Sequence, residues 1–231
     1  LMGPNGAGKS TTLNAIAGVW PVDCGQILID GKDISALPEH KRAPYLGRVF
    51  QDPMTGTVAD MEIIENLAIA ARRGKKRGLS WGVKADERIR YRQMLAEFDL
   101  GLEDRMSSKV GLLSGGQRQA ITLLMATIKK PKLLLLDEHT AALDPKTAAK
   151  VLELSDKIIA ENNLTALMVT HNMHDAITHG NRLIMMSDGK IILDISGEEK
   201  KNLTVEHLLE MFEKASGSKL ENDRMLLSKD K

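Results

Sequence analysis

The sequence predicts an α/β fold with a mainly parallel sheet and an inserted helical subdomain. The run Leu133–Leu136 is apolar without alternation, as expected of a parallel strand covered on both faces, and Thr165–Thr170 is the next buried strand. Segments with helical spacing alternate with these strands, which is typical of a layered α/β core. From about residue 58 to 127 the patterns are helical only, and this stretch indicates an insertion into the core.

The first half of the chain opens with a glycine-rich loop that continues as a helix. That helix stops at Gly18, a residue that commonly ends helices. Further on, Asp30-Gly31 is a hairpin-type turn signal that follows an alternating strand. The predicted elements are one helix, two strands and two further helices: 10–18, 26–30, 46–50, 62–72 and 85–98.

In the second half, Ser114 occupies a helix cap with Gln117 three residues later, so a helix is predicted from this point through Ile128. Pro145 stands at a tolerated first-turn position of a long helix. A hairpin around Asp188-Gly189 and a tail with one amphipathic helix complete the chain. The remaining predicted elements are a helix, a strand and two hairpin strands: 145–162, 165–170, 182–187 and 190–195.

Composition excludes several classes of protein. The 231 residues are 42% hydrophobic and 27% charged, with a net charge of +1, so no global field favours nucleic acid. The single Cys24 excludes an internal disulfide, and with no signal peptide in the sequence this predicts a reducing, cytosolic environment. No apolar stretch approaches the ~18 to 20 residues that span a bilayer.

The opening loop fits the spacing of a phosphate-binding loop, Gly-x-x-x-x-Gly-Lys-Ser. Glycines let backbone N–H groups approach phosphates, and the following helix directs its positive end at them. Lys9 is expected to reach the β- and γ-phosphates, and the Ser10 hydroxyl to ligate Mg²⁺. The alternative, a glycine-rich turn, does not account for the helix that follows. The predicted nucleotide-binding residues here are Gly3, Pro4, Asn5, Gly6, Ala7, Gly8, Lys9, Ser10 and Thr11.

Two carboxylates follow the apolar strand that ends at Leu136. Asp137 is placed to hold the hydration shell of Mg²⁺, and Glu138 to orient or deprotonate the attacking water. Two acidic residues at the end of a strand are ordinarily a solvated pair without a catalytic role. The phosphate loop in the same chain favours a catalytic role for this pair.

The segment Leu113-Ser-Gly-Gly-Gln117 is a second helix start able to bind phosphate. In most proteins such a segment is merely a loop with a helix cap. One chain with two phosphate-binding helix starts suggests that two chains share each nucleotide, through Ser114, Gly115, Gly116 and Gln117.

These motifs, in this order, resemble the nucleotide-binding subunit of an ABC transporter over residues 1 to about 195. The resemblance implies ATP and Mg²⁺ as cofactors, with Gln51 sensing Mg²⁺ and the γ-phosphate. It further implies that Asp144 helps to position the opposing subunit and that His171 contacts the γ-phosphate. A lone histidine after a strand is usually structural, but His171 follows a strand end at the ligand-binding edge of the sheet.

His139 departs from the family pattern, which usually has proline at this position. It is either a local variation beside the site or the marker of a subfamily. The stretch from Asp137 to Pro145, together with Met168–Asn172, is similar to ATPases of amino-acid importers.

The resemblance implies an ATPase domain over 1–195, with its core at 1–57 and 128–195 and a helical subdomain at 58–127, and a charged extension at 196–231. The expected partners are a second copy or a paired ABC subunit, a membrane permease and a substrate-binding protein, with no nucleic acid. The expected location is the inner face of the cell membrane. A soluble ABC ATPase that acts on ribosomes or DNA is the alternative, yet 231 residues hold neither a second cassette nor a long coiled coil.

Only Leu1 and Met2 precede the loop, whereas a phosphate loop needs a buried strand before it. We therefore expect a longer natural chain, in which roughly 30 upstream residues supply that strand and an antiparallel pair.

Overall fold

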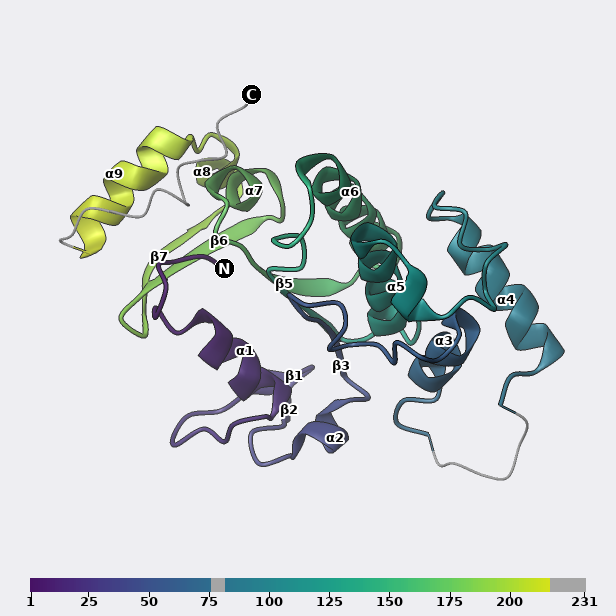
Figure 1. Cartoon of the computed structure of the whole chain (residues 1–231). Coiled ribbons are helices and arrows are strands. Elements are labelled where there is room, and N and C mark those ends of the chain that lie inside the picture. Colours follow the sequence, from purple (N-terminus) through teal and green to yellow (C-terminus); the bar gives the residue numbers. More distant parts are fainter. Residues whose placement is uncertain (76–81, 217–231) are drawn as a thin grey trace. The chain divides into compact units, whose positions relative to one another are not determined.

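A computed structural model describes residues 1–75 and 82–216 (Figure 1). The chain forms two compact units, and each is described by itself. The first unit joins Leu1–Ala15 to Met168–Lys231, and the second is the continuous segment Ile16–Leu167. Helix α1 (Lys9–Ala17) and strand β5 (Thr165–Val169) each begin in one unit and end in the other.

The first unit is built on a small sheet that brings distant parts of the chain together. Strands β6 (Arg182–Ser187) and β7 (Lys190–Ser196) form an antiparallel hairpin. Met2 pairs in parallel with Met185, through Met2 N–H to the Ile184 carbonyl and Met186 N–H to the Met2 carbonyl, both 2.9 Å. On its other side, the Leu1 carbonyl accepts from the Thr170 N–H, just beyond β5. Leu1 and Met2 therefore act as a strand between the end of β5 and β6.

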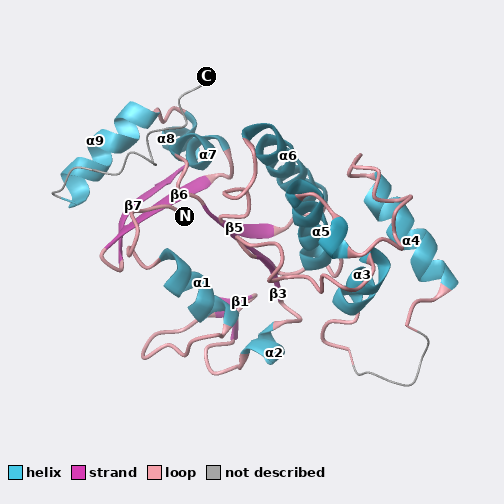
Figure 2. Cartoon of the chain, in the orientation of Figure 1, coloured by secondary structure: helices cyan, strands magenta, loops and turns pink. Residues whose placement is uncertain are grey.

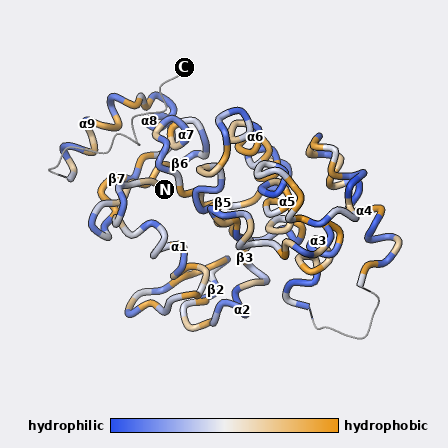
Figure 3. Tube along the Cα trace, in the orientation of Figure 1, coloured by the Kyte–Doolittle hydropathy of each residue, from blue (hydrophilic) through white to orange (hydrophobic). Residues whose placement is uncertain are grey.

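Three helices cover this hairpin: α7 (Met173–Thr178), α8 (Gly197–Lys201) and α9 (Val205–Ser216) (Figure 2). Leu208 and Phe212, four residues apart on α9, are buried in a core that also holds Met185 and Ile195. Polar and apolar residues alternate along α9 (Figure 3), as expected of a helix with one buried face.

The second unit begins with a short antiparallel pair, β1 (Leu28–Ile29) and β2 (Lys32–Asp33), and the helix α2 (Glu39–Arg42). Arg42 is only 1% exposed. Its guanidinium donates to the carbonyls of Leu37, Ile16 and Ser35 at 2.7, 2.9 and 2.7 Å. A buried cation is tolerated here because its donors reach backbone oxygens.

Strand β3 (Leu46–Val49) pairs in parallel with β4 (Leu133–Asp137), and the strand order is β3-β4-β5. Helix α5 (Gly115–Thr127) packs on β3 so closely that a Cβ at Gly47 would lie 2.5 Å from a carbonyl of α5. Helix α6 (Pro145–Glu161) lies against α5. The inserted helices are α3 (Ile63–Ala71), α4 (Ala85–Ala96) and the short 3-10 turn η1 (Val110–Leu112).

The structure confirms most predicted elements to within a few residues. The strand predicted over 26–30 is reduced to Leu28–Ile29, since its partner β2 has only two residues. Helices α2, α7 and α8 were not predicted, because each is six residues or shorter and shows no sustained period. The predicted domain limits at 57, 127 and 195 stay a prediction. Residues 76–81, between the predicted helices 62–72 and 85–98, and part of the predicted extension, 217–231, lie outside the described residues. None of the described helices is both long and apolar enough to cross a bilayer.

Candidate nucleotide-binding site

The phosphate loop in the first unit has the backbone that its glycines predict. Gly3 has φ +148, and a Cβ there would lie 2.2 Å from the carbonyl oxygen of Met186. Gly8, with φ +97, precedes the first residue of α1. Gly3 is thus required by close packing on the hairpin, and Gly8 by a backbone conformation that side chains rarely adopt.

Lys9 lies over this loop and is 6% exposed. Its ammonium donates to the carbonyls of Gly3 and Pro4 at 2.7 and 3.0 Å. The positive charge is therefore held directly above the loop backbone, beside the N-terminal end of α1. That arrangement presents an ammonium and a helix N-terminus to the same anion.

The loop is fixed from below by the hairpin. The Gly189 N–H donates to the Ala7 carbonyl at 3.2 Å, and the Thr12 hydroxyl contacts the sulfur of Met186 at 3.8 Å. The Asp188-Gly189 turn, predicted as a hairpin signal, thus also supports the phosphate loop. This second role could not be found from local sequence.

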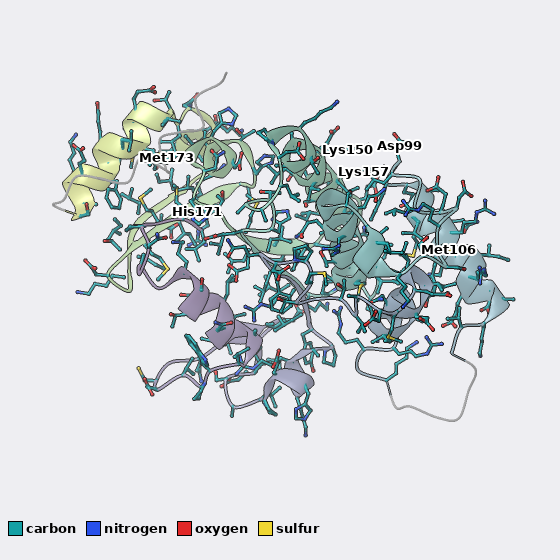
Figure 4. All side chains as sticks on the ribbon, viewed as in Figure 1. Asp99, Met106, Lys150, Lys157, His171 and Met173 are labelled. Carbon is teal, nitrogen blue, oxygen red and sulfur yellow. The ribbon has the colours of Figure 1, made fainter. Side chains whose placement is uncertain are left out.

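His171 belongs to the same edge of the first unit (Figure 4). The Thr170 N–H donates to the Leu1 carbonyl, so the segment that ends at Thr170 lies beside the short strand that leads into Gly3. His171 is the next residue after that segment. Asn172 then caps α7 by accepting from the N–H groups of His174 and Asp175. The structure thus places His171 and the loop at the ends of neighbouring strands.

The carboxylates occupy the second unit, at the end of β4. Val49 pairs with Leu136, so Gln51 and the Asp137-Glu138 pair follow the ends of adjacent parallel strands. Gln51 is exposed, whereas both carboxylates are half-buried. The structure brings these three residues to one edge of the sheet, as expected for parallel strands.

Asp137 has a neighbour that sequence reasoning missed. The Arg48 guanidinium lies 3.7 Å from the Asp137 carboxylate and 4.6 Å from the centre of the Phe50 ring. The available signal in the sequence was a single arginine in an otherwise apolar strand, one residue before the end of that strand. A positive charge therefore lies beside the Asp137 carboxylate.

Glu138 has φ +46, an uncommon conformation for a residue with a side chain. Such a conformation costs about 1–3 kcal/mol and persists where the surroundings enforce it. A turn follows, closed by the Ala141 N–H on the Glu138 carbonyl at 3.0 Å. Inside this turn His139 is buried, 2% exposed, with Nε2 3.0 Å from the Ser155 hydroxyl of α6.

The predicted second helix start has the expected cap. The Ser114 hydroxyl accepts from the Gln117 N–H, and the Gln117 side chain accepts from the Ser114 N–H, at 3.3 and 3.2 Å. Ser114 and Gly115 are exposed, while Gly116 is buried. The start of α5 is therefore rigid and still accessible to an anion.

The loop after β4 supports this helix start within the same unit. A Cβ at Gly116 would lie 2.2 Å from Thr147 Cγ2, and one at Gly115 would lie 3.2 Å from Leu143. Asp144 caps α6, accepting from the Thr147 N–H at 3.1 Å. Hydrogen bonds from the side chain and the backbone of Thr147 lower the pKa of Asp144. Leu143 and Thr147 are thus supporting residues that the sequence did not reveal.

A groove of about 680 Å³ borders the start of α5 in the second unit. Its wall includes Ser114 and Gly116 on one side and α6 on the other, with Asp99, Lys150 and Lys157 labelled in Figure 4. The Lys150 ammonium donates to the Asp99 carbonyl at 3.1 Å. Lysines and glutamates both line the groove, so its charge is mixed.

The donor set suits Mg²⁺. No group of three or more His, Cys, Asp or Glu that could hold a metal occurs within residues 1–75 and 82–216. Mg²⁺ needs none, because it usually keeps several waters and binds one or two carboxylates together with substrate phosphates. Asp137, half-buried at the end of β4, is a carboxylate of that kind.

Comparisons with known proteins identify the family of this chain. Residues 1–141 match the family model described as ABC transporter. The chain belongs to the ABC transporter family. A tyrosine transport ATP-binding protein of Clostridioides difficile is 47% identical over 215 residues, covering 93% of this chain and 85% of that protein. A spermidine/putrescine import ATP-binding protein PotA of Haemophilus influenzae is 35% identical over 199 residues. The chain spans 50% of the length of that relative.

Solved structures show the same fold. An ATP-binding cassette of an ABC transporter in its ADP conformation superposes with a TM-score of 0.74 at 29% identity, covering 91% of this chain and 85% of that one. A cassette in a dimeric post-hydrolysis state with ADP and Pi gives 0.70 at 31% identity, covering 84% of this chain and 83% of that one. The predicted fold class and the predicted ATPase activity are confirmed: the chain is the ATP-binding subunit of an ABC transporter.

Proposed function

We propose that this ATPase powers an importer, as a peripheral subunit on the inner face of the cell membrane, bound to a separate permease. Two copies, or one copy and a paired ABC subunit, close over two ATP molecules. The observation that carries this proposal is the capped, exposed start of α5, a second anion-binding helix start in a chain that already has a phosphate loop. A relative of known structure is dimeric with ADP and Pi, which supports a paired arrangement.

Each composite site draws on both chains. In one chain, Lys9 and the loop backbone bind the phosphates, Glu138 orients and deprotonates the attacking water, and His171 contacts the γ-phosphate. The other chain contributes Ser114 and Gly116. Catalysis then consists mainly of positioning and of stabilising charge around the γ-phosphate.

Ser10, Gln51 and Asp137 are the residues that would hold Mg²⁺. When bound, the ion neutralises charge on the phosphates. Glu138 and Asp137 have different tasks although they are adjacent, since one acts on water and the other on the metal hydration shell. Asp144, which caps α6, holds the first turn of that helix against Gly116 and so helps to present the start of α5 to the opposing chain.

The transported substrate is an amino acid in this proposal. The tyrosine transport relative shares 47% of its residues with this chain over most of both lengths, whereas the polyamine importers share about a third. A substrate-binding protein would deliver the substrate to the permease. Exposed apolar side chains of the helical segment, among them Val58, Ile69 and Ile89, provide surface for the permease.

Two inactive variants test the shared site. Lys9→Ala removes the cation that binds the phosphates and should abolish ATP binding and hydrolysis. Ser114→Arg should abolish hydrolysis yet leave ATP binding to the monomer nearly unchanged, because Ser114 serves the opposite nucleotide. Mixing the two variants assembles pairs with one intact composite site, so ATPase activity should partly return.

Nucleotide affinity by titration and phosphate release in the mixture are the measurements. If Ser114→Arg weakens monomer binding as much as Lys9→Ala does, or if the mixture stays inactive while mixed pairs form, the shared-site proposal is wrong. Gly82→Ala is the control, since an added Cβ there meets nothing within 4 Å.

A further inference from the structure

A buried side-chain contact joins the turn that carries Glu138 to helix α6. His139, the second residue of the turn, places Nε2 3.0 Å from the Ser155 hydroxyl, 16 residues further along the chain. Both residues are 2% exposed. The neighbouring carboxylate is half-buried and thus open to solvent, so the turn faces outward at Glu138 and inward at His139.

The hydrogen bond has a defined direction. The Ser155 hydroxyl has one hydrogen, and it donates that hydrogen to the Val151 carbonyl of its own helix at 2.8 Å. Its oxygen is then the acceptor for His139, whose Nε2 carries the proton. A rigid helix therefore fixes the orientation of the imidazole ring.

This contact acts where the backbone needs support. Glu138 has φ +46, and its carbonyl closes the turn with the Ala141 N–H at 3.0 Å. Rotation of the turn would move both the Glu138 side chain and the His139 ring. Because the ring is buried and bonded to α6, the turn resists this rotation and the backbone of Glu138 is held in place.

We propose that His139, anchored by Ser155, is the positioning residue for Glu138 in ATP hydrolysis. It acts through the backbone of its neighbour. This inference rests on the proposed role of Glu138 as the base. It also gives a function to the position at which the sequence departs from the family pattern.

The kinetic test separates positioning from binding. His139→Ala and Ser155→Ala should each lower kcat about 10- to 100-fold, since small misplacement of a catalytic group has effects of that size. The KM for ATP and the affinity for ADP should stay within about twofold, because no phosphate contact is changed. His139→Gln keeps an N–H donor able to reach Ser155 and should recover most of the lost turnover.

A matched control addresses stability. Thr127 in α5 is also a buried hydroxyl, 7% exposed, that donates to the carbonyl four residues earlier at 2.8 Å. Thr127→Val should lower the thermal midpoint comparably to Ser155→Ala and leave kcat unchanged when both are assayed well below their midpoints. If kcat instead follows stability across all these variants, or if Ser155→Ala has normal kcat, the positioning role is wrong.

Glu138→Gln distinguishes the two proposals. Near-normal hydrolysis in this variant would remove the base assignment, and the positioning role with it. A Glu138→Gln variant that is inactive beside a fully active His139→Ala would overturn the positioning role alone. In single-turnover assays, adding His139→Ala to Glu138→Gln should lower the residual rate by less than twofold, since the group being positioned is already lost. A further loss of tenfold or more would show that His139 acts by another route.

Discussion

Replacing Gly116 by alanine should destabilise the second unit, because the new Cβ would lie 2.2 Å from Thr147 Cγ2. Carbon atoms in good contact stand about 3.5–4.0 Å apart, so one group must move by roughly 1.5 Å. Overpacking of this kind costs about 1–3 kcal/mol, and the better helix propensity of alanine returns at most about 1 kcal/mol. We expect a net loss of about 1–2 kcal/mol in the free energy of unfolding.

Urea denaturation of Gly116→Ala measures this loss, and Thr147→Ser provides the rescue. Serine keeps the backbone N–H that caps α6 and removes the Cγ2 methyl that obstructs the new side chain. The double variant should therefore recover most of the lost stability, with a coupling energy above about 0.5 kcal/mol. Gly82→Ala serves as the control in open space. A Gly116→Ala protein as stable as this control would refute the close contact between α5 and the first turn of α6.

Two further predictions concern stability. Arg42→Lys should lower the free energy of unfolding, measured by urea denaturation, by about 2–4 kcal/mol, because one ammonium cannot replace a guanidinium that donates to three carbonyls. Arg92→Lys, at an exposed ion pair, should lower it by under about 1 kcal/mol. Comparable losses in both variants would contradict the buried role of Arg42. Asp144 has a lowered pKa in the folded state, so its stabilising contribution is present above its ordinary pKa of 3.8 and is lost as the pH falls through the lower folded value. Asp144→Asn should therefore lose less stability than the parent chain as the pH falls below 3.8, and identical pH profiles would argue against the cap.

Local patterns predicted the parts of the site that are built from neighbouring residues. The cap at Ser114 and Gln117 follows from spacing alone, and so does the strand that delivers Asp137 and Glu138. The cap is formed by atoms three residues apart, and the strand is marked by its own apolar run although it pairs with the distant β3.

Contacts between distant residues were not predictable in the same way. Arg42 lies in a segment for which no helix or strand is predicted, and only the folded unit brings three carbonyls around it. The sequence marked His139 as unusual, but its partner Ser155 looks like any serine in a helix. Gly116 resembles a flexible loop glycine, whereas in the structure it is required by the methyl group of Thr147.

The phosphate loop rests on the hairpin β6–β7, and this has a consequence for how the chain is made. Thr12 and its contact Met186 are 174 residues apart in sequence. Closing a loop of that length costs about 4–5 kcal/mol in chain entropy. Residues 16–167 form a continuous unit whose internal contacts require no residue beyond 167. At about 5–20 residues per second, the hairpin follows within seconds, and only then does the loop gain its support. Competence to bind ATP should thus appear late in synthesis, after the unit that carries Glu138 has folded.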